Sequence, residues 1–343
     1  MKGIIIAGGL GTRLRPLTLL RPKPLVPIVN APLLEYQLMY LRSAGITTVC
    51  FATNYMADVI QEQLGDGSAY GMELIYATES EPLDTGGAIR NAYDALKPDD
   101  CVVFNGDTIH GFDIGAIVNR HRGRGGDVTL TLIEAQRPHA YGVVPISEDD
   151  RVLAFLEPTE EQKRRLASDE GGSDFINAGL YVLSRAVLDR FPVGRSNVER
   201  DVFPRLIGEG ARVLGDVQSE FWIDIGRPSQ YLDAVRAVIE GVIPSARELP
   251  KTDGSAIHPT AEIHKTAKIG GASSIGPSVK IGEGAVVLGS AVLDGAQIES
   301  GATVENSVVC ENALIREFAV VSNSALGPGS VVTAYSRVGG MSS

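Results

Sequence analysis

Residues 257–332 carry an aliphatic side chain at nearly every sixth position, and this repeat constrains the fold more than any other feature. Glycine, alanine and serine fill most positions between, which argues against a helix. The aliphatic positions are Ile257, Ile263, Ile269, Ile275, Ile281, Val287, Val292, Ile298, Val304, Val308, Leu314, Val320, Leu326 and Val332. Hexapeptide repeats of this kind are typical of a parallel β-helix whose aliphatic side chains point inward. We therefore predict a left-handed parallel β-helix over residues 257–343.

Residues 1–240 instead alternate between strand-like and helix-like segments. The expected strands are Ile4–Ala7, Thr48–Ala52, Glu73–Tyr76, Cys101–Asn105, Asp127–Ile133 and Gly179–Leu183. The expected helices are Leu33–Ser43, Ala57–Leu64, Ala88–Leu96, Ile114–Arg122, Arg185–Arg190 and Ser229–Glu240. This alternation predicts an α/β, Rossmann-like domain with a mostly parallel sheet. Residues 241–256 are then expected to be a linker between two domains.

Composition limits the classes of function. The formal net charge of −11 argues against a nucleic-acid surface, which needs a basic patch. No apolar run approaches the roughly 20 residues of a membrane span, and the N-terminus lacks a signal-peptide pattern, so we expect a cytoplasmic protein. The three cysteines are widely spaced and are expected to stay reduced. The open coil end and flat faces of a β-helix favour a homo-oligomer.

The N-terminal segment predicts a site for a polyphosphate. Ile4–Ile6 is a buried-strand pattern, and the glycines within Gly8–Gly11 follow it, where backbone amides can approach an anion closely. Arg13 and Lys23 lie on the proline-rich stretch that comes next. The segment is not a P-loop, because no Gly-Lys-Ser/Thr follows, and Leu14 replaces the third glycine of a dinucleotide-binding fingerprint.

Residues 8–24 resemble the signature of the sugar-1-phosphate nucleotidyltransferases, or NDP-sugar pyrophosphorylases, which reads G-G-x-G-T-R-L-x-P-x-T followed by P-K-P. The resemblance implies that Arg13 holds the triphosphate of an NTP and that Lys23 neutralises charge at its α-phosphate. It also implies nucleotide contacts along the segment. The residues concerned are Ala7, Gly8, Gly9, Gly11, Thr12 and Arg13.

Further motifs of the same family follow in order. Thr85-Gly86-Gly87 resembles the L-G-T-x-G-A loop that contacts the nucleotide base, with Asp84 where a glycine is usual. Asn105-Gly106-Asp107 resembles the N-G-D motif, whose aspartate binds metal, and Asp224 matches the aspartate of W-x-D-I-G. The resemblance implies nucleotide contacts at Asn105 and Gly106, and Mg²⁺ held by Asp107 and Asp224.

The resemblance also implies a sugar-phosphate subsite, with one departure from the pattern. Its residues would be Tyr141, Gly142, Glu157, Asn177 and Asp224. The family usually has a lysine after the glutamate, whereas this chain has Pro158. Lys163, Arg164 and Arg165 follow shortly after, and spacing leaves open whether one of them substitutes.

The family resemblance covers essentially the whole chain, and it is strongest with bacterial GDP-mannose pyrophosphorylases. It implies in-line attack of a sugar 1-phosphate on the α-phosphorus of an NTP, with GTP and mannose 1-phosphate favoured. The alternatives are a cyclitol or deoxysugar phosphate acceptor with GTP, ATP, UTP or dTTP, and an inactive regulatory subunit that binds a nucleotide sugar. Acyl transfer, known for other hexapeptide-repeat proteins, is disfavoured because no histidine follows His264.

Overall fold

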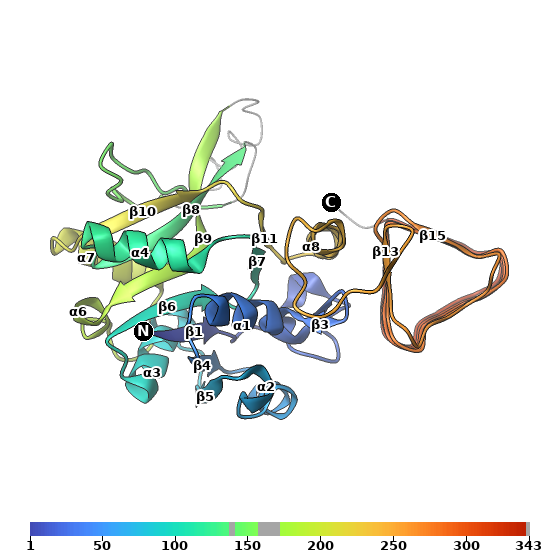
Figure 1. The fold of residues 1–343 in the computed structure, drawn as a ribbon, viewed down its shortest axis with the longest axis horizontal. Coiled ribbons are helices and arrows are strands. Elements are labelled where there is room, and N and C mark those ends of the chain that lie inside the picture. The colour runs from blue at the N-terminus through green and yellow to red at the C-terminus, as the bar shows by residue number, and fades with distance from the viewer. Residues whose placement is uncertain (137–140, 157–171, 341–343) are drawn as a thin grey trace. The chain divides into compact units, whose positions relative to one another are not determined.

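The computed structural model describes residues 1–136, 141–156 and 172–340. Its contacts divide the chain into two compact units, which we describe separately (Figure 1). The first unit comprises Met1–Gly8, Gln37–Thr108 and Phe112–Trp222. The second unit comprises Gly9–Tyr36, Ile109–Gly111 and Ile223–Ser343. The domain boundaries expected from the sequence, at residues 240 and 257, stay a prediction.

A seven-stranded sheet in the order β10-β8-β9-β6-β1-β4-β5 forms the core of the first unit. Its strands are β1 (Lys2–Ile6), β4 (Thr48–Thr53), β5 (Glu73–Thr78), β6 (Asp100–Asn105), β8 (Val128–Gln136), β9 (Ser173–Ser184) and β10 (Val213–Gln218). Only β9 runs antiparallel to its neighbours, so the prediction of a mostly parallel sheet is confirmed. The parallel strands β4, β1 and β6 end at one edge, which is where such sheets bind ligands.

Helices cover the sheet, so its strands are buried and consist of apolar runs, and these runs made the strands predictable from the sequence. Ile4, Val103 and Phe104 are fully buried, as expected for strands with two covered faces. Helix α3 packs on β1, β4 and β5, and α4 packs on β8 and β9. The α-helices are α1 (Leu33–Ser43), α2 (Ala57–Leu64), α3 (Asp84–Leu96), α4 (Ile114–Arg124), α6 (Arg185–Leu188), α7 (Phe203–Gly208) and α8 (Pro228–Glu240).

Five strands of the described part of residues 1–240 were not predicted, among them β2 (Pro27–Ile28) and β3 (Ala31–Pro32), which pair with each other. In β10, Gly215 and Asp216 interrupt the apolar run, and Asp216 is buried against Arg120 with a closest N–O distance of 2.8 Å. Strands β7 (Thr108–His110) and β11 (Trp222–Asp224) form a separate two-stranded sheet and are too short for a period to show.

In the second unit, residues 255–339 form the predicted left-handed parallel β-helix, whose coils stack as a triangle in Figure 1. Three sheets make its sides. The strands of the first sheet are β12 (Lys251–Thr252), β13 (Ser255–Ile257), β16 (Ser274–Ile275), β19 (Ala291–Val292), β22 (Val308–Val309) and β25 (Ala325–Leu326). Those of the second are β14 (Glu262–Ile263), β17 (Lys280–Ile281), β20 (Gln297–Ile298), β23 (Leu314–Ile315) and β26 (Val331–Val332). Those of the third are β15 (Lys268–Gly270), β18 (Val286–Leu288), β21 (Thr303–Glu305), β24 (Val320–Ser322) and β27 (Arg337–Gly339).

The predicted inward positions are correct up to Val304, but three of the later ones are wrong. Strand pairing aligns Val292 with Val309 and then with Leu326, so Val309 points inward in place of Val308. In the same way Ile315 and Val321 replace the predicted Leu314 and Val320. Each wrong position precedes a second aliphatic residue, so a count of aliphatic side chains could not choose between the two.

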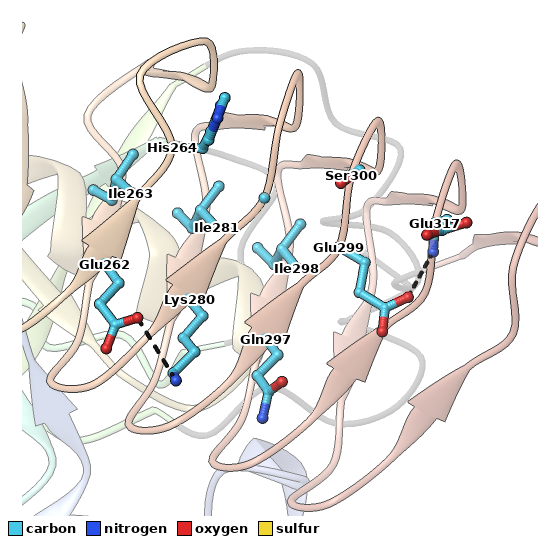
Figure 2. A pocket seen from close by; sticks show the side chains of 11 residues that line it. Glu262, Ile263, His264, Lys280, Ile281, Gln297, Ile298, Glu299, Ser300 and Glu317 are labelled. Atoms are coloured by element: carbon cyan, nitrogen blue, oxygen red, sulfur yellow. Dashed lines mark hydrogen bonds and ion pairs between the residues drawn. The ribbon is translucent and has the colours of Figure 1, made fainter.

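Figure 2 shows the ladder that the second sheet makes: Ile263, Ile281 and Ile298 stack one coil apart, beside the outer row of Glu262, Lys280 and Gln297. Identical side chains at the same place in successive coils join into one hydrophobic cluster along the β-helix. Glu262 and Lys280 form an ion pair across two coils at 3.6 Å. Each coil is therefore stabilised chiefly by its neighbours.

The outer side of the first sheet is also covered. Ala291 and Val308 are fully buried although they are not among the side chains of the β-helix interior. The N-terminal segment of the second unit reaches this side: a Cβ built at Gly327 would lie 3.6 Å from Pro16 Cβ, and Arg21 forms an ion pair with Glu311. This burial explains why the sequence has two adjacent valines at 308 and 309.

Candidate functional site

Residues 9–25, which we call the signature loop, form a closed structure in the second unit. Gly11 has φ 57°, in the left-handed region, and a Cβ there would lie 3.0 Å from both Lys23 Cβ and Thr18 Cγ2. The Thr18 hydroxyl donates to the Gly11 carbonyl at 2.8 Å. Glycine is therefore needed at position 11, and the Thr18 hydroxyl fixes the loop.

Two predicted cations meet one predicted carboxylate in this unit. The Lys23 ammonium lies 3.3 Å from Asp224 Oδ1, and both side chains are largely buried, with 11% and 21% exposed. A Cβ built at Gly226 would lie 3.5 Å from Asp224 Oδ2 and 3.8 Å from the Arg13 guanidinium carbon. Arg13, Lys23 and Asp224 thus gather around Gly226 although about 200 positions separate the loop from Asp224. Two cations held in this way suit an anionic group with several oxygens.

In the first unit, Asn105 ends β6 and Gly106 and Asp107 follow it at the ligand-binding edge of the sheet. Gly106 has a packing reason of its own: its amide donates to the Ile6 carbonyl at 2.9 Å, and a Cβ would lie 2.4 Å from that oxygen. Gly179, with φ 73°, lies against the Asn105 side chain. Gly106 and Gly179 therefore leave no room for a side chain where β1, β6 and β9 meet.

The predicted sugar-side residues also lie in the first unit. Asn177 donates to the Tyr181 hydroxyl at 2.8 Å and to the carboxylate of Glu199. Burial raises the pKa of Tyr181, and the negative charges of Glu199 and Asp107 raise it further, so the hydroxyl stays protonated. Glu199 is not among the site residues expected from the sequence, and its bond from Asn177 makes it a site candidate.

Trp222 connects this region with Tyr141. The indole N–H donates to the Ala178 carbonyl at 2.7 Å, and the Tyr141 ring meets the indole edge-on with centroids 5.8 Å apart. Tyr141, with Gly142 beside it, is therefore close to the residue that follows Asn177. Glu157, Pro158 and the cations 163–165 lie outside the described residues.

Gly86 and Gly87 have a packing role in the first turn of α3. Both amides donate to the Ser196 carbonyl, at 2.7 and 3.2 Å, and are therefore already used within the protein. A Cβ would lie 2.6 Å from Ser196 Oγ at Gly86 and 2.4 Å from the Gly194 carbonyl at Gly87. Packing against Gly194 and Ser196 therefore accounts for the two glycines without a ligand. Contact of this turn with the base stays a prediction.

Glu79, just beyond the end of β5, was missed by the sequence analysis. Its side chain is mostly buried, and its carboxylate accepts from the Leu83 amide at 3.1 Å. Burial raises the pKa of Glu79, the Leu83 bond opposes that rise, and Asp84 adds to it. The available signal was its place after a strand, in T-E-S-E-P, but the pattern does not distinguish Glu79 from Glu81.

Among residues 1–136, 141–156 and 172–340, no three metal-binding side chains gather. Asp107 and Asp224 each supply carboxylate oxygens, the ligand type that Mg²⁺ prefers. Mg²⁺ usually takes one or two carboxylates and completes its shell with water and substrate phosphates. Each aspartate therefore offers a ligand that suits a divalent ion arriving with a nucleotide, and the use of both for one ion stays a prediction.

A groove of about 570 Å³ on the second sheet of the β-helix holds a different kind of surface (Figure 2). Its charged side chains are engaged with one another across coils: Lys280 with Glu262, and Glu299 with Arg316 and with the Glu317 amide. These contacts stabilise the stack, and we assign them no ligand.

The fold and these residues agree with comparisons to known proteins. The profile of the family described as "Nucleotidyl transferase" matches residues 2–241, and that of the "GMPPB C-terminal domain" matches residues 252–342. In the described residues, no helix is both long and apolar enough to cross a membrane.

The chain is similar to the mannose-1-phosphate guanylyltransferase of Mycobacterium tuberculosis, with 41% identity over 75% of this chain and 72% of that protein. It is similar to the mannose-1-phosphate guanyltransferase of Saccharomyces cerevisiae, with 35% identity over 68% of this chain and 63% of that protein. The chain therefore spans about two thirds of the length of these relatives. The crystal structure of HddC from Yersinia pseudotuberculosis matches with a TM-score of 0.57 and 30% identity, over 68% of this chain and 97% of HddC. The chain belongs to the nucleotidyl transferase family.

Proposed function

We propose that the protein is a mannose-1-phosphate guanylyltransferase, which makes GDP-mannose and pyrophosphate from GTP and mannose 1-phosphate. The observation that carries this proposal is the gathering of Arg13, Lys23 and Asp224 around Gly226. The names of the relatives supply the substrates: the Mycobacterium and Saccharomyces proteins are both named for mannose 1-phosphate and guanylyl transfer.

The reaction we propose is an in-line displacement at phosphorus. A phosphate oxygen of mannose 1-phosphate attacks the α-phosphorus of GTP, a new P–O bond forms, and the bond to the β-phosphate oxygen breaks. The departing electron pair leaves on pyrophosphate, so no side chain needs to form a covalent bond. Positioning and charge stabilisation therefore supply the rate enhancement.

Each cation of the signature loop has a role in this step. Arg13 binds the β- and γ-phosphates with its planar fork of donors and stabilises the leaving pyrophosphate. Lys23 neutralises the charge that builds on the α-phosphate, and its ion pair with Asp224 holds the ammonium in place before substrate arrives. Enzymes of this family generally use a divalent metal; we propose Mg²⁺, bound by Asp107 and Asp224, which would neutralise charge on the phosphates.

Glu79 supports guanine as the base. The Watson–Crick edge of guanine presents two neighbouring N–H donors, and a carboxylate can accept from both at once. Adenine presents a single donor there, its 6-amino group, beside the N1 acceptor, and that acceptor would repel the same carboxylate. Because Glu79 is mostly buried, an unsatisfied charge at this position would be costly, which favours the base that pairs with it.

Asn177 and Glu199 support a sugar as the acceptor. Both N–H groups of the Asn177 amide are engaged, so its oxygen and the Glu199 carboxylate would accept hydrogen bonds from neighbouring sugar hydroxyl groups. Tyr141 and Trp222 add aromatic surface next to them. We further propose a cytoplasmic location and a homo-oligomer built partly through the β-helix, where the exposed, stacked rings of Phe318 and Tyr335 offer apolar surface.

Pyrophosphate release tests the proposal across five NTPs and a panel of sugar 1-phosphates. GTP with mannose 1-phosphate should give the highest kcat/KM. Turnover with GTP and a cyclitol or deoxysugar phosphate alone would move the acceptor to the alternative class. If the protein binds nucleotide but is silent with every pair, and Asp107→Ala leaves that binding unchanged, the inactive regulatory reading replaces the enzyme.

A further inference from the structure

Asp84 opens helix α3 in a conformation that glycine would adopt more easily. Its φ is 58°, in the left-handed region that disfavours a side chain. Glycine, the usual residue of the family at this position, would take this backbone without strain. The aspartate therefore needs a compensating interaction, and its side chain supplies one.

The Asp84 carboxylate joins two distant segments of the first unit. Oδ1 accepts from the Thr85 amide at 2.7 Å and from Asn197 Nδ2 at 3.0 Å, and Oδ2 accepts from Arg200 at 3.2 Å. The Thr85 hydroxyl in turn accepts from the Val198 amide at 3.0 Å. We call this set of contacts the clasp. Glycine at position 84 could make none of the side-chain bonds.

From the clasp, hydrogen bonds continue to the proposed sugar-side residues. Asn197 Oδ1 accepts from the amides of Glu199 and Arg200, both at 3.0 Å, and so begins the short helix Val198–Val202. The Glu199 carboxylate then accepts from Asn177. One unbroken chain of bonds thus runs from the start of α3 to Asn177.

The charge of Asp84 is stable at neutral pH. Burial raises its pKa, but hydrogen bonds from Thr85 and Asn197 and the charge of Arg200 outweigh burial, so the pKa is lowered. Both bonds to the 197–200 segment are therefore made by an ionised acceptor, which strengthens them.

We propose that Asp84 is a positioning residue that couples the nucleotide subsite to the sugar subsite through the clasp. When GTP orders the start of α3, the clasp fixes Asn197 and hence Glu199 and Asn177, so mannose 1-phosphate binds with less ordering cost. The coupling is reciprocal for binding affinities. This inference rests on the proposed function, because it assigns the two ends of the chain of bonds to GTP and to the sugar.

Calorimetry measures the coupling directly. The Kd of mannose 1-phosphate is determined with and without a saturating GTP analogue that has a methylene group between its α- and β-phosphorus atoms. For the native protein we expect the analogue to lower this Kd by about 5-fold or more. For Asp84→Gly, which relieves the backbone strain and removes the clasp, we expect a ratio near 1. Asp84→Asn keeps an acceptor oxygen and should give an intermediate ratio.

A matched control separates the clasp from backbone strain. Asp253 also has a left-handed φ, 49°, and lies on the exposed turn between β12 and β13. Asp253→Gly makes the same chemical change and should keep the native ratio. Arg200→Gln, at a side chain that is 57% exposed, weakens the clasp without a change at position 84 and should reduce the ratio.

The results distinguish this inference from the proposed function. If GTP and mannose 1-phosphate give no pyrophosphate, the proposed function fails. If the native protein is active but its ratio is 1, or Asp84→Gly and Arg200→Gln both keep the native ratio, the coupling role of Asp84 is overturned.

Discussion

Arg21, two residues before Lys23 in the signature loop, forms an ion pair with Glu311 of the β-helix. The two side chains are 25% and 13% exposed, so water screens the pair only in part. Exposed pairs contribute about 0.2–1 kcal/mol, whereas removal of one partner of a buried pair costs about 3–5 kcal/mol. Since the burial of this pair is intermediate, we expect the removal of one partner to cost about 1–2 kcal/mol.

If this pair holds the loop, Glu311→Gln should weaken GTP binding more than it slows chemistry. Since about 1.4 kcal/mol is a factor of ten, we expect KM for GTP to rise about 5- to 30-fold. We expect kcat to change less, because Lys23 keeps its own ion pair with Asp224.

A double-mutant cycle with Arg21→Gln, Glu311→Gln and both together, followed by pyrophosphate release, checks this. The double variant should raise KM for GTP by about the same factor as either single variant. As a control, Arg236→Gln breaks an exposed pair with Asp233 on α8 and should leave KM unchanged. Additive costs, to within about 0.3–0.5 kcal/mol, would refute the coupling and the reasoning from burial.

Three further predictions follow from single residues. Burial raises the pKa of Glu79, so the free energy of unfolding of the native protein, relative to that of Glu79→Gln, should fall as pH rises from about 4.3 through that raised pKa. Denaturant titrations at several pH values measure this difference in free energy, and a difference that does not change with pH would contradict the prediction. Trp222, the one tryptophan of the chain, contacts Tyr141, so mannose 1-phosphate should change its fluorescence saturably; an unchanged spectrum at saturation would remove it from the sugar side. Burial raises the pKa of Cys50 and of Cys310 to about 12, so a chromogenic thiol reagent should label neither until the protein unfolds; rapid labelling of the native protein would contradict their burial.

Much of the fold could be predicted because its patterns are local. Helices α1 and α2 begin and end at the predicted residues, since each has an apolar face with a regular period. The β-helix repeat was predictable for the same reason, up to the doubled aliphatic positions after Val304. At Val308, burial on the outer side of the first sheet accounts for the second valine, and no local sequence pattern shows that burial.

The site was predictable only in part because its contacts are distant in sequence. Resemblance supplied Lys23 and Asp224, but their ion pair joins positions that are 201 apart. The replacement of glycine by Asp84 was visible in the sequence, whereas its compensation by Asn197, 113 positions later, was not. Glu79 was missed because its character comes from burial, which composition cannot give.

The coil length of the β-helix limits how the chain can evolve. The first coil is 18 residues long, and the later ones are 17, as the spacing of matched side chains shows. A gain or loss of one whole coil, 17 or 18 residues here, keeps every later side chain facing the same way, whereas a fraction of a coil rotates all of them. A whole coil removed before Glu311 would still carry that carboxylate about 4.8 Å along the axis and away from Arg21. We therefore expect duplication or deletion of a whole coil to be tolerated after Glu311, whereas the ion pair with Arg21 fixes the number of coils before it.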